Sequence, residues 1–401
     1  PSSDHKYADD FEWRDKTNYF ETSPAFFSLN ERGRRVPHDQ LCFSNPSLRK
    51  ELTKNVLKDI RHAKSKGWES FSITISADDN PGRFCHCPRC VALEEKYKTP
   101  GGPIIDYVID LGKLLKEKHP SVKVRTSAYR RSQTQHPPVL PDGVPFPDNI
   151  AVRFAPIEDC YFADWWNHRR AGIQETFNDL LGWSRIASHI RTSFYPNPYG
   201  TGSRMPVGNV ERIVNNFRLL AYAGVEGIFV DHPFILSRSG FSELQRYLMF
   251  RLMKNVNCDA DAVITEFTDY FYGAAGSVMR TYIRELEACR KNMELPGGVT
   301  YKSKDYDQST FPYLTLENLY RWQKSFDRME ALTTDQPDKR LHVRMERREL
   351  DLATLWKWFE VKEKYPDYFK NYKVHANRIR KVNDAITEQN RWLRRLGAGT
   401  R

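Results

Sequence analysis

The first 240 residues of the chain alternate between two hydrophobic patterns. Short β-branched segments that predict strands occupy residues 70–76, 122–129, 149–157, 188–195 and 225–234. Between them, apolar residues recur at intervals of three and four, which is typical of amphipathic helices. The helix predicted from Pro46 places Leu48, Leu52, Val56 and Ile60 on one face. Repeated strand–helix units predict parallel strands with helices outside the sheet.

The strand pattern stops near Gly240. Helical spacing continues in segments 241–256, 261–273, 277–293, 314–329 and 344–393. We therefore expect two regions, an α/β domain over residues 1–240 and an α-helical region over residues 241–401. Trp and Tyr side chains in these helices are predicted to lie in the core of a helical bundle.

Evenly spaced parallel strands form either a doubly wound sheet or a (β/α)8 barrel. No Gly-x-Gly-x-x-Gly follows any predicted strand and no Walker loop is present, so the nucleotide-binding signatures are missing. Polar residues stand at the strand ends instead, which favours a TIM-barrel-like domain. If residues 72–76 are the fourth strand, AFFSLN at 25–30 is the third. About 20 residues precede it, which is too few for two more strands with their helices. Either the first strands are lacking from this chain, or the strand count is wrong, or the barrel is incomplete.

Composition and charge limit the class of protein. Of 401 residues, 40% are hydrophobic and 13% aromatic, which excludes intrinsic disorder. No apolar run approaches the ~18 residues of a membrane span, so no membrane association is expected. The net charge of +11 comes from basic residues interleaved with acids, and no nucleic-acid-binding motif is present. The charge indicates a solvated positive surface or attraction to acidic or sulfated glycans.

Five predicted strand ends carry the side chains that could perform chemistry. These are Asp78-Asp79, Tyr129, Glu158 (followed by Asp159), Tyr195 with Asn197, and Asp231-His232. In a barrel all five meet at one mouth, where paired carboxylates suit glycoside hydrolysis. Adjacent carboxylates repel each other, which raises one pKa toward the value that a general acid needs. The alternative is that the Asp-Asp-Asn-Pro-Gly segment at residues 78–82 is only a polar turn.

Four of the seven cysteines lie in the first hundred residues, three of them in the segment Phe-Cys-His-Cys-Pro-Arg-Cys at residues 84–90. Disulfide bonds, with Cys42 paired to one of the three, are the favoured interpretation. A structural metal site at Cys85, Cys87 and Cys90, with Cys42 or His86 as the fourth ligand, is the second. Redox chemistry is the third.

The order of several segments resembles the bacterial domain-of-unknown-function 4838 family. The resemblance runs from about Phe26 to Gly273 and is most specific in the aspartate and cysteine motif from Asp79 to Cys90. Part of that family is glycoside hydrolase family 163, which contains endo-acting β-N-acetylglucosaminidases. The Asp78-Asp79 pair is also similar to the catalytic pair of the family 84 hexosaminidases, which share a substrate-assisted mechanism with families 18 and 20.

The resemblance implies a retaining β-N-acetylhexosaminidase that needs no organic cofactor. Asp78 is expected to orient the substrate acetamido group, and Asp79 to protonate the leaving oxygen and then deprotonate water. Tyr129, Glu158, Tyr195, Asn197, Asp231 and His232 are expected to bind the sugar. A glycan partner and a periplasmic or secreted location follow from the same resemblance.

Three other functions are compatible with the sequence. An acidic-sugar hydrolase of the α-glucuronidase type is favoured by the positive charge and by Arg125, Arg130, Arg131 and Arg153 near strands. The second is a non-catalytic glycan-binding protein. A zinc-dependent hydrolase at the cysteine segment is a further alternative.

Overall fold

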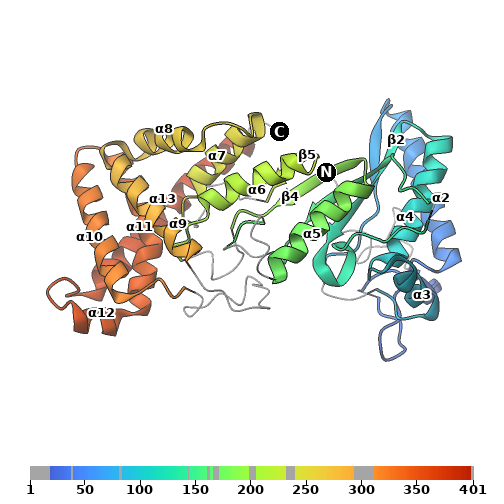
Figure 1. Cartoon of the computed structure of the whole chain (residues 1–401), viewed down its shortest axis with the longest axis horizontal. Coiled ribbons are helices and arrows are strands. Elements are labelled where there is room, and N and C mark those ends of the chain that lie inside the picture. Colours follow the sequence, from blue (N-terminus) through green and yellow to red (C-terminus); the bar gives the residue numbers. More distant parts are fainter. Residues whose placement is uncertain are drawn as a thin grey trace. The chain divides into compact units, whose positions relative to one another are not determined.

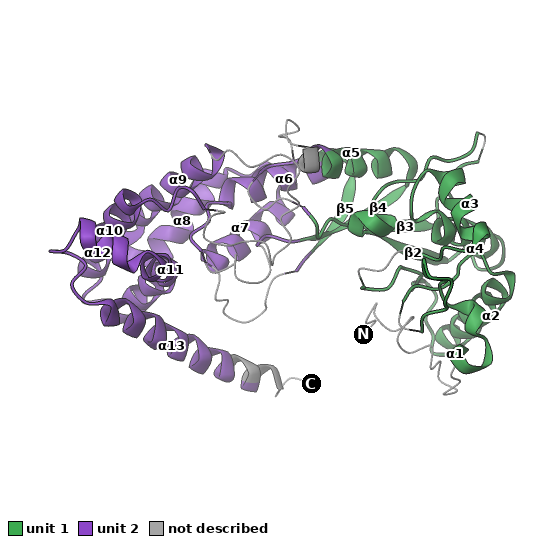
Figure 2. Ribbon diagram, turned by 90° about the horizontal axis from the view of Figure 1, so that it is seen from below, with its two compact units in different colours: residues 1–158, 175–194, 222–229 green, residues 159–174, 195–221, 230–401 purple. Residues whose placement is uncertain are grey.

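A computed structural model describes residues 19–37, 39–80, 84–142, 144–159, 163–165, 171–197, 205–231, 240–292 and 311–398. The chain divides into two compact units (Figure 2). Unit 1 comprises residues 1–158, 175–194 and 222–229, and unit 2 comprises residues 159–174, 195–221 and 230–401. The two units are therefore interleaved along the sequence.

A five-stranded parallel sheet is the centre of unit 1 (Figure 1). Its strands are β1 (Phe71–Thr74), β2 (Val122–Tyr129), β3 (Ile150–Ala155), β4 (His189–Phe194) and β5 (Val225–Val230). The order in space is the order along the chain, β1-β2-β3-β4-β5. Val124 of β2 pairs with Ile73 on one side and with Ile150 on the other. All five segments predicted as strands are thus strands of one sheet.

The sequential strand order decides between two types of parallel sheet. A doubly wound sheet contains a point where the strand order reverses. No reversal occurs among the five strands, and every connection steps to the next neighbour. The chain is therefore a mixed α/β protein with a sequentially wound parallel sheet, while the described residues do not show a closed barrel.

The segment at residues 25–30 differs from the prediction. A 3-10 helix covers Pro24–Phe26, and Phe27 and Leu29 then form isolated antiparallel bridges with Leu41 and Arg35. The chain reverses at Gly33, whose φ of +71° suits glycine. The prediction of a third barrel strand here is wrong, because this turn brings residues 35–41 back beside residues 27–29 in antiparallel bridges. Counting strands from this segment is therefore not valid.

Local signals place the helices of unit 1, which are α1 (Tyr19–Thr22), α2 (Pro46–Ser65), α3 (Pro88–Tyr97), α4 (Gly102–Lys118) and most of α5 (Ala171–Ile186). The Asn45 side chain caps α2 by accepting hydrogen bonds from the N–H groups of Ser47 and Leu48, and Pro46 occupies the first turn. The predicted apolar face of α2 is buried, with Leu48 and Ile60 fully inaccessible.

The two faces of the sheet have different chemistry. Val122, Val124, Ile150, Val152 and Phe154 are fully buried on one face. Helix α4 packs on β2 and β3 on this side, so closely that a Cβ at position 112 would lie 2.8 Å from the Ile150 side chain. The opposite face carries polar side chains because residues alternate along each strand, and it includes Arg125, Arg153 and Arg191. Arg153 of β3 and Arg191 of β4 are directly opposite each other in the strand register.

Unit 2 is helical. It contains α6 (Val210–Tyr222) except for its last residue, followed by α7 (Ser242–Lys254), α8 (Ala260–Tyr272), α9 (Gly276–Lys291), α10 (Leu316–Leu332), α11 (Pro337–Trp356), α12 (Trp358–Lys364) and α13 (Tyr372–Ala398). Trp322 and Tyr282 are buried and their rings meet edge to face, as predicted for core aromatics. Among the described residues, no helix is both long and apolar enough to cross a membrane.

The predicted long helical stretch over residues 344–393 is interrupted. Helix α11 ends at Trp356, α12 ends at Lys364, and α13 begins at Tyr372. Helix α12 stops before Tyr365 because Pro366 disfavours helical backbone at the preceding residue. The interruption lets α13 return and pack along α11.

Candidate functional site

The consecutive acids predicted from sequence lie in the loop that follows β1. Asp78 is half-buried and Asp79 is exposed. The buried side chain of Gln40 holds the loop, since it accepts the Asp78 N–H at 2.9 Å and donates to the Asp78 carbonyl at 3.0 Å. The Asp78 carboxylate accepts a hydrogen bond from the Asn80 amide at 3.2 Å. Gln40 therefore fixes the backbone from which both acids project.

Asp79 contacts the end of the neighbouring strand β2. Its Oδ1 accepts a hydrogen bond from the Tyr129 hydroxyl at 2.6 Å and another from Arg130 Nη2 at 3.0 Å. Burial alone would lower the pKa of Arg130, but the hydrogen bond to Asp79 and nearby negative charge outweigh this and raise the pKa. The site thus pairs a cation with Asp79 through a charge-assisted hydrogen bond.

The backbone at Arg130 is unusual. Its φ is +52°, in the left-handed region that non-glycine residues rarely occupy, and a short π-helix over Arg130–Thr134 begins there. Thr134 stabilises the turn, because its hydroxyl accepts the Tyr129 N–H at 3.0 Å and donates to the Ser127 carbonyl at 2.6 Å. Left-handed backbone at such a residue costs about 1–2 kcal/mol. Strain of this kind is found where a side chain must be aimed at a ligand or partner.

Glu158 joins the cluster from the end of β3. Its Oε2 accepts the Arg131 N–H at 3.0 Å, and its Oε1 lies 4.0 Å from Arg130 Nη1. One guanidinium therefore faces two carboxylates, Asp79 and Glu158. The structure brings together the ends of β1, β2 and β3, as predicted for Asp79, Tyr129 and Glu158. The sequence did not assign Arg130, Gln40 or the strained turn to the site. The signal for Arg130 was its position directly after Tyr129, in a pair of consecutive arginines at a strand end.

A second polar cluster lies beside this one in unit 1. His136 Nδ1 is 2.8 Å from Asp179, and its Nε2 is 3.3 Å from Glu175. The hydrogen bond with Asp179 raises the pKa of His136 above its ordinary value. Arg131 also pairs with Glu175, at 3.1 Å. This network holds the segment after the π-helix against α5.

The remaining predicted binding residues belong to unit 2. The amide of Asn197 donates to Gln245 at 2.7 Å and accepts from Asn209 at 3.0 Å, so it forms part of an amide network. Tyr195 is half-buried directly after β4, and Asp231 is exposed directly after β5. His232 lies outside the described residues. Asp159 forms a buried ion pair with Arg212 at 2.7 Å, which is a structural role.

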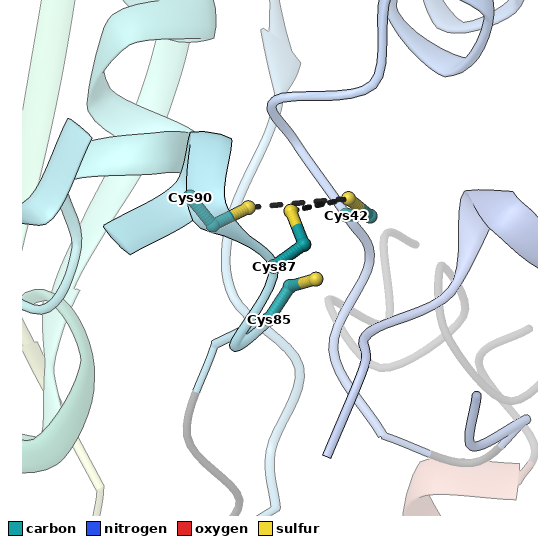
Figure 3. A group of neighbouring side chains, drawn as sticks. All are labelled: Cys42, Cys85, Cys87 and Cys90. Atoms are coloured by element: carbon teal, nitrogen blue, oxygen red, sulfur yellow. Dashed lines mark hydrogen bonds between the residues drawn. The ribbon is translucent and has the colours of Figure 1, made fainter. Parts of the chain in front are cut away.

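The cysteines predicted as a cluster do meet, and Cys42 rather than His86 supplies the fourth side chain (Figure 3). The sulfurs of Cys42, Cys85, Cys87 and Cys90 all lie within 4.8 Å of one another. None of the six described cysteines forms a disulfide. Cys42 and Cys87 have their sulfurs 3.7 Å apart, well beyond the about 2.05 Å of a disulfide bond. The disulfide predicted for Cys42 is therefore absent from this structure.

These features define a mixed α/β protein with a cluster of charged and hydroxyl groups at the carboxyl edge of a parallel sheet. The model of the family described as "Domain of unknown function (DUF4838)" matches residues 9–284, which is more than half of the chain. The chain belongs to this family, which confirms the resemblance to the domain-of-unknown-function 4838 family. No curated protein matches the sequence.

Proposed function

We propose that this protein is a glycoside hydrolase that acts on glycans containing N-acetylated sugars. The observation that supports the proposal most strongly is the cluster of Asp79, Tyr129, Arg130 and Glu158, which three successive strands bring to one edge of the sheet. Carboxylates, a phenol and a guanidinium are the groups that bind sugar hydroxyls and support acid–base chemistry.

The fold is compatible with this chemistry. A sequential all-parallel order is the order of strands in a (β/α)8 barrel, and catalytic groups of such barrels stand at the carboxyl ends of strands. We propose that the sheet of unit 1 is the strand wall of a barrel-type active site. The glycan substrates of such an enzyme occur outside the cytoplasm. We therefore propose that the protein is exported to the periplasm or secreted.

The proposed reaction uses the substrate's own acetamido group as nucleophile. Its oxygen bonds to the anomeric carbon while the glycosidic C–O bond breaks, and an acid of the protein protonates the leaving oxygen. The resulting oxazoline opens when water attacks the anomeric carbon and gives a proton to the same residue. A second carboxylate accepts the acetamido N–H and stabilises the positive charge on nitrogen.

The contacts of the two aspartates favour an exchange of the roles expected from the family resemblance. Arg130 and Tyr129 both donate to Asp79, which favours a carboxylate that stays ionised. An ionised carboxylate suits the residue that receives the acetamido N–H. Asp78 is more buried than Asp79, and burial favours the protonated form of a carboxyl group, which a proton donor needs. We therefore assign the proton donor to Asp78 and the orienting anion to Asp79.

Two substrates test this assignment with variants Asp78→Asn and Asp79→Asn. An N-glycan needs protonation of its leaving group, whereas a dinitrophenyl N-acetylglucosaminide does not. We expect Asp79→Asn to lower kcat on both substrates by about 10²–10⁴-fold. Asp78→Asn should lower kcat/KM on the N-glycan by a similar factor and leave most of kcat/KM on the dinitrophenyl substrate, because kcat/KM reports the step in which the leaving group departs. Its kcat on the dinitrophenyl substrate should still fall, because the same residue deprotonates water when the oxazoline opens.

Asp142→Asn is the matched control, since Asp142 is an exposed acid in the loop before β3. It should leave both activities unchanged. Glycan products are measured by mass spectrometry and dinitrophenol by absorbance. Binding of the N-glycan by wild type without any hydrolysis would instead establish a glycan-binding protein and end the hydrolase proposal.

One observation favours a second candidate function, an acidic-sugar hydrolase. A cavity of about 360 Å³ over the polar face of the sheet is lined by Arg125, Arg153 and Arg191, among other residues. Clustered guanidinium groups suit carboxylate recognition. Cleavage of an aryl glucuronide, with no cleavage of N-acetylated substrates, would support this alternative against the first.

A further inference from the structure

We propose that Cys42, Cys85, Cys87 and Cys90 bind one zinc ion as a structural, four-thiolate site (Figure 3). The proposal concerns a site separate from the acids of the proposed active centre, and it does not depend on the hydrolase function.

The spacing of the sulfurs fits a tetrahedral zinc. Four sulfurs at the usual Zn–S distance of about 2.3 Å lie about 3.8 Å apart along each edge of the tetrahedron. Cys42 Sγ is 3.7 Å from Cys87 Sγ and 3.9 Å from Cys90 Sγ. A disulfide needs about 2.05 Å. These two distances therefore fit sulfurs that bind one metal ion far better than sulfurs joined by a covalent bond.

The surroundings supply hydrogen-bond donors that suit thiolates. Cys85 Sγ accepts the Leu29 N–H at 3.2 Å and a guanidinium N–H of Arg35 at 3.4 Å. The Ser44 hydroxyl lies 3.4 Å from Cys87 Sγ, to which it can donate, and accepts a hydrogen bond from the Cys90 thiol at 3.1 Å. Donors of this kind hold metal ligands in place and stabilise their charge. Zinc with four thiolates carries a charge of −2, which the Arg35 cation partly offsets.

The site would be closed, which indicates a structural role. Cys42, Cys85 and Cys90 are at most 2% exposed, and four cysteines fill the coordination of zinc. A catalytic zinc keeps one position for water. The four-sulfur arrangement therefore contradicts a zinc-dependent hydrolase at this segment.

The ligands join two segments with little regular structure. Cys42 follows the antiparallel bridge at Leu41, whereas Cys85, Cys87 and Cys90 lead into the first turn of α3. Gln40, which holds the backbone of Asp78, is two residues before Cys42. A metal at this position would fix the segment around Gln40, which contacts the loop of consecutive acids, and the cysteine segment, which follows that loop in the sequence. Zinc would thus help to hold the backbone of Asp78 and Asp79 in place without contacting the substrate.

Metal analysis of the full chain, purified without chelator, tests the proposal. We expect about one zinc per chain in wild type and in the control Cys258→Ser, which changes a cysteine of unit 2. Cys87→Ser, at the most exposed of the four ligands, should lose most of the zinc. Zinc near zero in wild type, stoichiometric iron, or unchanged zinc in Cys87→Ser would each overturn the proposal.

A second measurement on wild type does not depend on the folding of any variant. Cobalt added to chelator-treated protein should give the visible absorption bands of a tetrahedral cobalt–thiolate centre, and zinc should displace them. Chelation should also expose four additional thiols to a thiol reagent. Peptide mapping without reduction that finds a disulfide among these cysteines in the zinc-free native protein, with no cobalt bands, would contradict the site.

Discussion

Asp351 in helix α11 provides a sharp test of the electrostatics of unit 2. Its side chain is 1% exposed and accepts hydrogen bonds from Arg378, at 2.6 and 2.8 Å, and from Gln323 at 2.9 Å. His375 Nδ1 lies 2.6 Å away. Burial alone would raise the pKa of Asp351, but the hydrogen bonds from Arg378 and His375 lower it to about 2.

The pKa determines how this carboxylate contributes to stability. A fall from the ordinary 3.8 to about 2 corresponds to about 2 kcal/mol of stabilisation at neutral pH. Because the folded-state pKa is the lower one, this contribution is complete above the unfolded-state pKa. It is lost as the pH falls from about 5 to about 2.

Replacement of Asp351 by Asn should destabilise the protein at pH 7 by about 3–5 kcal/mol, because Arg378 is left without its buried partner. The difference between wild type and variant should shrink by about 1 kcal/mol at pH 3 and by about 2 kcal/mol at pH 2, as wild-type Asp351 takes up a proton. Urea unfolding followed by far-ultraviolet circular dichroism measures this difference.

Asp384→Asn is the control, since Asp384 is an exposed acid of α13, 3.7 Å from Arg380. Its effect should stay below about 0.5 kcal/mol at every pH. A difference between wild type and Asp351→Asn that is the same at pH 7 and pH 3 would refute the reasoning.

Two further predictions concern unit 1. Arg130→Gly should be more stable than Arg130→Ala in urea unfolding, by about 0.5–1 kcal/mol, because glycine accepts the positive φ at this position; equal stabilities would show that the backbone is not strained. Both variants should lose activity alike if the guanidinium holds Asp79. Gly112→Ala should destabilise by about 1–2 kcal/mol, because its Cβ would lie 2.8 Å from Ile150 Cδ1. Adding Ile150→Val, which removes that atom, should recover part of the loss in a double-mutant cycle, whereas Lys113→Ala on the exposed side of α4 should be nearly neutral.

Part of the candidate site could be predicted because parallel strands bring their carboxyl ends to one edge. This rule alone places Asp79, Tyr129 and Glu158 together once their strands are recognised. Arg130 was harder to place, because its direction depends on a left-handed backbone that is rare for arginine. Asn197 shows the converse: it follows a strand as predicted, but its amide is engaged by Asn209 and Gln245.

The sequence by itself determined the local elements of this protein. Period-two and period-three-to-four patterns identified all five strands and the main helices, and Asn45 with Pro46 marked the start of α2. These signals act within a few residues of the chain, so they can be recognised without knowing the rest of the fold.

Only the tertiary structure decided which distant segments meet. It set the order of the strands, turned residues 27–41 into an antiparallel pair instead of a barrel strand, and brought Cys42 to the three cysteines of residues 85–90. Such contacts depend on turn geometry and packing between segments far apart in the chain. The cysteine pattern favoured disulfides over a metal site, whereas sulfur distances of 3.7 and 3.9 Å from Cys42 to Cys87 and Cys90 show that neither pair is disulfide-bonded in the structure.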